Sequence, residues 1–212
     1  MAPPSISEQN DADSNTSSFT IDNDGIVSIE IDKLRAVFAT KDVIPPLGWP
    51  AVHAFESKHN IILPEPYRTF VAEIANGCRE GPPHYGLVSL GHSGSNNIPV
   101  ECDLSSPFPL TRKWIWEDDP QPPEAFPMYQ LEEDGPDLSC LGRGCLELGT
   151  DGCGMDWYLI VTGEHRGQIW NIADVGAGPF GAPFGNTTAQ PGFAGWVLHW
   201  AAGKEWWLDD EE

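Results

Sequence analysis

Cysteines and histidines are the first candidates for chemistry, because thiolates and imidazoles bind metals and act as nucleophiles. The sequence holds two such groups: Cys140, Cys145 and Cys153, and His84, His92 and Cys102. Structural zinc sites usually pair ligands two to four residues apart and use four ligands. Here the nearest cysteines are Cys140 and Cys145, and a fourth ligand would have to come from His165 or elsewhere. We therefore favour buried, unreactive thiols, and predict no metal.

Two glycine-containing stretches are similar to enzyme motifs but lack the elements that make those motifs work. Residues 176–181, GAGPFG, match the dinucleotide-binding pattern, in which a helix must open at the third glycine to bind pyrophosphate. Pro179 and Pro183 remove N–H donors and block that helix, so the sequence predicts a Gly/Pro loop. Residues 91–95, GHSGS, approach a nucleophile elbow, but Ser95 replaces the last glycine and the α/β pattern is missing. We predict no cofactor and no catalytic residue, and thus no enzyme.

Carboxylates are the most abundant charged groups, with 32 Asp and Glu against 11 Lys and Arg and a net charge of −21. Neighbouring acids such as Asp118 and Asp119 point apart on a loop, so acid–base catalysis is not predicted. So acidic a surface repels nucleic acid and anionic membranes, which bind through Lys and Arg. Two interpretations remain: the charge maintains solubility, or it attracts a basic protein partner.

The acids are unevenly distributed, which favours a role in binding. Residues 114–138 and the last eight residues contain many acids and no Lys or Arg. Such blocks are the first place to look for a basic ligand. We predict that the loop 114–138, together with residues 151–156, contacts a basic partner through Glu117, Asp118, Asp119, Glu132, Glu133, Asp134, Asp151 and Asp156.

Three helices are expected before the acidic loop. They cover about Ile29–Ala39, Pro50–His59 and Pro64–Ala75; a hairpin around Asn23-Asp24-Gly25 is an alternative start to the first. The third has the clearest specification. Pro64 and Pro66 suit a first helical turn, and Tyr67, Phe70, Val71 and Ile74 recur at helical spacing. Asn76-Gly77 then ends the helix, with Gly77 in a left-handed conformation.

Strands and one further helix are expected in the second half. The predicted strands are His84–Leu90, Cys145–Asp151, Met155–Gly163 and Gly167–Ile172. The last two form a hairpin, because glycines bracket a short turn. Residues 91–138 are an irregular connection anchored by Trp-Ile-Trp at 114–116, and Phe193–Ala202 is an apolar helix. Helices, then an antiparallel sheet, then a terminal helix make an α+β fold.

Tryptophans near the C-terminus allow two interpretations. Trp196 and Trp200 share one helix face and are predicted to be core. Trp206 and Trp207 lie among acids, where they are either an interface anchor or part of the core.

These motifs together resemble the signatures of the SUKH superfamily, which includes yeast cell-wall assembly regulators and bacterial toxin-immunity proteins. The first signature matches Phe55, Glu56, Leu63, Pro64, Tyr67, Phe70, Asn76, Gly77 and Tyr85-Gly86. The second matches Leu146, Gly149, Asp151, Gly152, Gly154, Leu159, Val161, Gly163, Gly167 and Trp170. The matches extend from about Trp49 to Trp200. The acidic insertion at about 107–138 and the N-terminal tail depart from the simplest members.

The resemblance implies a single domain in which a bent antiparallel sheet is packed by helices, and it implies binding of other proteins. The matched positions listed above look structural. We expect a disordered tail at 1–18, a SUKH-like domain at 19–205 and an acidic tail at 206–212. The expected function is that of a cytoplasmic immunity protein that neutralises a basic toxin, such as a nuclease. The alternative is a regulatory scaffold of the cell-wall assembly type. An enzyme of unknown reaction is the third hypothesis.

Overall fold

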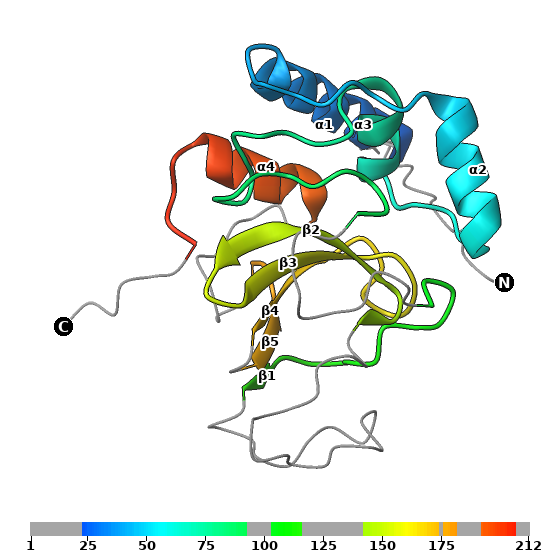
Figure 1. Cartoon of the computed structure of the whole chain (residues 1–212), viewed down its shortest axis with the longest axis vertical. Coiled ribbons are helices and arrows are strands. Elements are labelled where there is room, and N and C mark those ends of the chain that lie inside the picture. Colours follow the sequence, from blue (N-terminus) through cyan, green and yellow to red (C-terminus); the bar gives the residue numbers. More distant parts are fainter. Residues whose placement is uncertain (1–22, 93–102, 116–141, 174–175, 182–191, 207–212) are drawn as a thin grey trace, which may run out of the picture.

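The computed structural model describes residues 23–92, 103–115, 142–173, 176–181 and 192–206. The elements in chain order are α1 (Asn23–Phe38), α2 (Trp49–His59), α3 (Tyr67–Glu73), β1 (Trp114–Ile115), β2 (Cys145–Gly152), β3 (Met155–Ile160), β4 (Ile169–Ala173), β5 (Gly176–Pro179) and α4 (Phe193–Ala201). N-terminal helices, an antiparallel sheet and a C-terminal helix make this the predicted α+β fold (Figure 1).

The five strands form one sheet in the order β1-β5-β4-β3-β2, and every neighbouring pair is antiparallel. Successive side chains of a strand point to opposite faces. On β3, Trp157 and Leu159 accordingly join one hydrophobic cluster, whereas Tyr158 and Ile160 join another. The sheet is therefore covered on both faces, which explains why apolar runs rather than alternating patterns fill β3 and β4.

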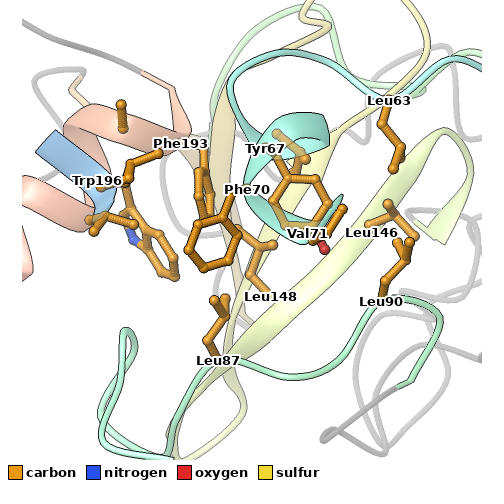
Figure 2. Packing of buried hydrophobic residues seen from close by; sticks show 14 of the residues in the cluster. Leu63, Tyr67, Phe70, Val71, Leu87, Leu90, Leu146, Leu148, Phe193 and Trp196 are labelled. Atoms are coloured by element: carbon orange, nitrogen blue, oxygen red, sulfur yellow. The ribbon is translucent and has the colours of Figure 1, made fainter. Parts of the chain in front are cut away.

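The first cluster lies between the sheet and the helices. Leu146 and Leu148 of β2 face Tyr67 and Phe70 of α3 in Figure 2. The Phe193 ring of α4 lies 5.0 Å from each of those two aromatic rings. Full burial of such side chains contributes about 1.5–3 kcal/mol each, so this junction is a major source of stability.

The second cluster covers the other sheet face and uses residues that the sequence analysis assigned to an insertion. Phe108, Leu110 and Trp114 are at most 5% exposed and pack with Tyr158 and Trp170. The predicted anchoring role of Trp114 is confirmed. Phe108, Leu110 and Trp114 thus place residues 107–115 against the sheet, and the rest of the insertion, 116–138, lies outside the described residues.

The predicted helices exist, with some different ends. α2 agrees with the prediction, and it ends where Asn60 takes a left-handed conformation and donates its N–H to Glu56 and Ser57. α1 begins at Asn23, six residues earlier than expected, and excludes the hairpin alternative there. α3 is shorter than predicted, because Pro64 to Pro66 form the preceding turn and the helix ends at Glu73. Gly77 is not its cap.

The predicted strand His84–Leu90 is wrong. Only Leu87 forms a bridge, with Cys78, while Tyr85 and Val88 donate N–H bonds to carbonyls of β2. Gly86 has a φ of +100°, which breaks the extended conformation between the two bonded residues. The segment is therefore a loop that follows the edge of β2.

The β3–β4 hairpin is confirmed, with both strands shorter than predicted. β5 is a finding that the sequence analysis missed, since residues 176–181 were interpreted as a loop. Gly176 and Ala177 pair with Ala173 and Ile172 of β4 on one side and with β1 on the other. Glycines and a proline are poor strand formers, so neighbouring strands rather than local propensity place this segment in the sheet.

Helix α4 agrees with the prediction to within one residue. Its Trp196 is completely buried, as expected, whereas Trp200 lies at the edge and is only partly buried. Trp206, assigned above to a tail, packs against the first cluster. Among the described residues, no helix has both the length and the apolar character needed to cross a membrane.

Candidate functional site

The predicted partner-binding acids divide into two groups. Six of them lie outside the described residues: Glu117, Asp118, Asp119, Glu132, Glu133 and Asp134. The other two, Asp151 and Asp156, lie on β2 and β3, and the structure shows what each contacts.

Asp151 is a cross-link between a loop and the sheet. One carboxylate oxygen accepts the backbone N–H of His84 at 2.9 Å, and the other accepts the indole N–H of Trp157 at 2.6 Å. A carboxylate that accepts two N–H groups is held in a fixed orientation. Asp151 therefore fixes the loop at His84 to the sheet.

Asp156 does not lie on the surface. It is 2% exposed, paired across the sheet with Thr150 and Ile172. A side chain so buried cannot touch a partner protein without opening the sheet. The prediction that Asp156 contacts a partner is wrong, because Asp156 and every later residue of β3 are buried.

Several residues of the structural signature are buried. Leu63, Pro64, Tyr67 and Phe70 are buried where the α2–α3 connection meets the sheet. Figure 2 shows the side chains of Leu63, Tyr67 and Phe70 in one packed layer. Trp170 is fully buried on the opposite sheet face.

Asn76 and Gly77 join three segments. Asn76 donates its backbone N–H to the carbonyl of Ile44, and its side-chain oxygen accepts the N–H of Leu90 at 3.0 Å. Gly77 has a φ of +134°, and a Cβ there would lie 2.7 Å from the carbonyl oxygen of Leu87. The pair is needed for close chain approach rather than for capping the helix.

Three of the signature glycines turn the chain at the two hairpins. Gly152 and Gly154 flank Cys153 in the β2–β3 turn, and all three residues have positive φ. Gly167 has a φ of +92° and closes the β3–β4 turn by donating its N–H to the carbonyl of Ile160.

Glu56 is a buried carboxylate whose role the sequence did not reveal. It is 6% exposed, accepts two hydrogen bonds from Arg68 at 2.8 and 3.0 Å, and also accepts the N–H of Leu63 at 2.9 Å. The Arg68 hydrogen bonds hold the pKa of the Glu56 carboxyl below its ordinary value of 4.5, against the opposing effect of burial. The group fastens α2 to α3 and is a structural rather than a reactive carboxylate.

The residues proposed as metal ligands do not come together in the described part of the chain. Cys145 is buried in the second cluster and Cys153 is exposed at a turn, while Cys102 and Cys140 lie outside the described residues. Within the described ranges, no group of three His, Cys, Asp or Glu side chains is placed to hold a metal ion.

One surface depression lies between α1 and α4. It has a volume of about 460 Å³ and is lined by Val37, Lys41, Trp200, Ala201 and Gly203. The Lys41 ammonium lies 5.3 Å from the centre of the Trp200 ring and 2.9 Å from a Glu80 carboxylate oxygen. Since its only charged group is already paired with Glu80, the depression offers no reactive group.

The charge is divided sharply between the described residues and the rest. All 11 Lys and Arg fall within the described ranges, together with 14 of the 32 acids. The other 18 acids fall outside those ranges, with no basic residue among them. We call the described residues the framework. The framework is thus nearly neutral, and the excess negative charge belongs almost entirely to the segments 1–22, 93–102, 116–141, 174–175 and 207–212.

The most exposed large apolar side chain of the described residues is Tyr85, at 68%. Its ring lies on the backbone of Gly152, where a Cβ would be 2.9 Å from the ring. The sequence analysis placed Tyr85 in a strand; the two prolines before it and the glycine after it are the signal of a loop tip that would have corrected this.

No family model, no curated protein and no solved structure matches this chain.

Proposed function

We propose that this chain is a cytoplasmic protein-binding domain that captures a basic protein partner through its acidic segments. Its proposed role is that of an immunity protein of the SUKH type, which covers the active site or nucleic-acid groove of a basic toxin. The observation that carries the proposal is the division of charge: a nearly neutral framework, and 18 acids with no Lys or Arg in the segments outside it.

The physical argument runs from charge to association. Like charges concentrated in a few segments repel one another, and a basic surface relieves that repulsion. Charge of one sign also steers an oppositely charged partner and raises its association rate by about 10- to 1,000-fold. Solubility alone does not require the framework and the other segments to differ so strongly. The α+β order, and the burial of Leu63, Tyr67, Phe70 and Trp170, are compatible with the resemblance to the SUKH superfamily.

The partner is sought among the products of the genes next to that of this chain. The purified full-length chain is titrated by calorimetry with each candidate that carries a net positive charge. Tight binding at low salt that weakens at least about tenfold at moderate salt supports electrostatic capture. If none of these basic proteins binds, or if the affinity does not depend on salt, the immunity proposal is refuted.

Matched charge variants then locate the contact. Neutralising Glu117, Asp118 and Asp119 together, as amides, should lower the affinity. The control neutralises three acids of the framework, Asp32, Glu65 and Glu164, and removes the same amount of charge. Equal losses for both triple variants would show a general charge effect, contrary to a contact in the 116–141 segment.

A second function is a regulatory scaffold that binds several basic proteins. The observation that favours it is that the acids outside the framework fall into separate runs at the N-terminus, in the insertion and at the C-terminus. A binding stoichiometry above one basic partner per chain would select the scaffold, and a one-to-one complex would select the immunity protein.

A further inference from the structure

A surface around Tyr85 has the features of a preformed binding anchor. It consists of His84, Tyr85, Asp151, Gly152 and Cys153, from the 84–90 loop and the β2–β3 turn. Within it, His84, Tyr85 and Cys153 are exposed. The His84 and Tyr85 rings meet edge to face with centroids 5.1 Å apart, so the two aromatic groups form one small exposed patch.

The backbone beneath this patch is fixed on several sides. Tyr85 donates its N–H to the carbonyl of Thr150, and Gly86 donates its N–H to that of Pro83. Asp151 holds the N–H of His84. Gly149 approaches so closely that a Cβ there would lie 2.4 Å from the carbonyl oxygen of Gly86. The loop is therefore docked tightly on β2, although the Tyr85 side chain faces solvent.

An exposed aromatic ring on a fixed backbone loses little conformational freedom when a partner covers it. Tyr is enriched among the residues that dominate binding energy at interfaces, since it brings a large rigid surface with few rotatable bonds. Ile62 is exposed to a similar degree, at 64%, but it is aliphatic and offers no π face. Exposure alone thus does not distinguish Tyr85; its ring and its fixed support do.

The local charge indicates which kind of side chain the ring would meet. One carboxylate belongs to the patch: Asp151 directly precedes Gly152, on which the Tyr85 ring lies, and accepts the backbone N–H of His84. Its two oxygens accept hydrogen bonds from His84 and Trp157, which fix the carboxylate beneath the loop. A guanidinium group stacks on a Tyr face by cation–π attraction, and a nearby negative charge strengthens the attraction.

We propose that Tyr85 is an anchor that binds an arginine side chain of the basic partner, stacked on the exposed part of its ring. The inference rests on the proposed function, since it names one contact within that interaction. Arginine is preferred to lysine because its planar guanidinium stacks on an aromatic face, whereas an ammonium is a compact and strongly hydrated charge.

The test uses a short oligo-arginine peptide as probe and the full-length chain labelled with 3-fluorotyrosine. Fluorine NMR follows the Tyr85 signal, assigned by its absence in Tyr85→Phe, and calorimetry gives the affinity. The expected result is a shift of the Tyr85 signal on titration. Tyr85→Ala should weaken binding about three- to tenfold, and Tyr85→Phe should keep it. An oligo-lysine peptide should bind more weakly than oligo-arginine.

Three variants make the result specific. Ile62→Ala removes an equally exposed apolar side chain and should bind the peptide as the wild type does. Tyr85→Leu keeps apolar surface without a π face and should bind as weakly as Tyr85→Ala; binding equal to wild type would overturn the cation–π contact. Unchanged melting temperatures are expected for all of them, because the substituted side chains are exposed.

The outcomes separate this inference from the function beneath it. If the wild type binds the peptide but Tyr85→Ala binds equally well and the Tyr85 signal stays still, the anchor is refuted while charge-driven capture stands. If the wild type does not bind oligo-arginine at all, both the proposed capture of basic partners and the anchor fail.

Discussion

The Glu56–Arg68 ion pair is the residue-scale feature with the clearest energetic consequence. Glu56→Gln removes the charge that Arg68 needs while keeping an acceptor for the N–H of Leu63. We expect a loss of about 1–3 kcal/mol in the free energy of unfolding at neutral pH, measured by urea titration. The matched control is Arg79→Ala, whose pair with Asp42 is 70% and 56% exposed and should cost less than about 1 kcal/mol.

The same carboxylate predicts a pH dependence. Because the pKa of Glu56 is lowered in the folded state, its stabilising effect is present above the ordinary value of 4.5 and is lost as the pH falls through the folded value. Wild type and Glu56→Gln should therefore differ most in stability at neutral pH and converge in acid. Urea titrations between about pH 7 and pH 3 check this; a constant difference would contradict the assigned cause.

Glycine positions permit a second matched comparison. Gly149 has a φ of +151°, and a Cβ there would meet both Gly86 and Pro83 within 2.5 Å. Gly203 has a φ of +64° with no neighbour within 4 Å, so alanine there meets only the backbone strain. Gly149→Ala should cost at least about 1 kcal/mol more than Gly203→Ala in thermal or urea unfolding, since it also displaces the 84–90 loop. Equal costs would mean that the close contact is easily relaxed.

At the scale of elements, the residues that follow α4 are part of the core. The Trp206 ring lies 5.0–5.9 Å from the rings of Trp157, Trp196, Phe180 and His199. His199 adds a hydrogen bond at 2.9 Å between its Nε2 and the carbonyl of Glu205. Of the two interpretations that the sequence allowed for Trp206, the structure selects core packing.

Two truncations test this assignment. A chain that ends at Lys204 loses Trp206 and should be destabilised by about 2–4 kcal/mol, with exposed apolar surface that binds a hydrophobic dye. A chain that ends at Leu208 removes only the four terminal acids and keeps the ring contacts of Trp206, and should unfold like the full chain. Equal stability of the two truncated chains would place Trp206 outside the core.

The elements show what local patterns can and cannot predict. The β3–β4 hairpin followed from the glycines at 163 and 167, and α2 followed from its apolar spacing and Pro50. β5 was missed because its residues, GAGP, have no strand propensity and are ordered only by pairing with β1 and β4. The 84–90 loop was mistaken for a strand because alternation of side chains does not reveal the positive φ of Gly86. Both errors come from tertiary context.

At the scale of the whole molecule, stability and binding should respond differently to salt. The framework holds 11 basic and 14 acidic residues, so its folding depends little on net charge. Raising the ionic strength from about 0.05 to 0.5 M should change the free energy of unfolding by less than about 1 kcal/mol. Binding of oligo-arginine should weaken at least tenfold over the same range. If the free energy of unfolding and the affinity for oligo-arginine fell together, the peptide would be bound by the framework itself.

The candidate site was less predictable than the fold. Composition revealed the acidic blocks, but it could not show that every basic residue lies in the framework. Asp151 was chosen for its charge and is instead a cross-link, while Asp156 was chosen likewise and is buried. A sequence lists charges without their burial, and burial decides whether a carboxylate meets a partner or holds a loop.

Because of the cross-link through Asp151, the fluorescence of Trp157 should report on the position of the 84–90 loop. Asp151 joins the backbone of His84 at the surface to the indole of Trp157 in the core. Indole emission depends strongly on what its N–H donates to. Any displacement of the 84–90 loop that shifts this carboxylate should therefore alter the fluorescence of a tryptophan that no ligand touches. Binding at the loop should then be measurable by fluorescence in the unlabelled protein. Asp151→Asn, which breaks the link between His84 and Trp157, should reduce this fluorescence response.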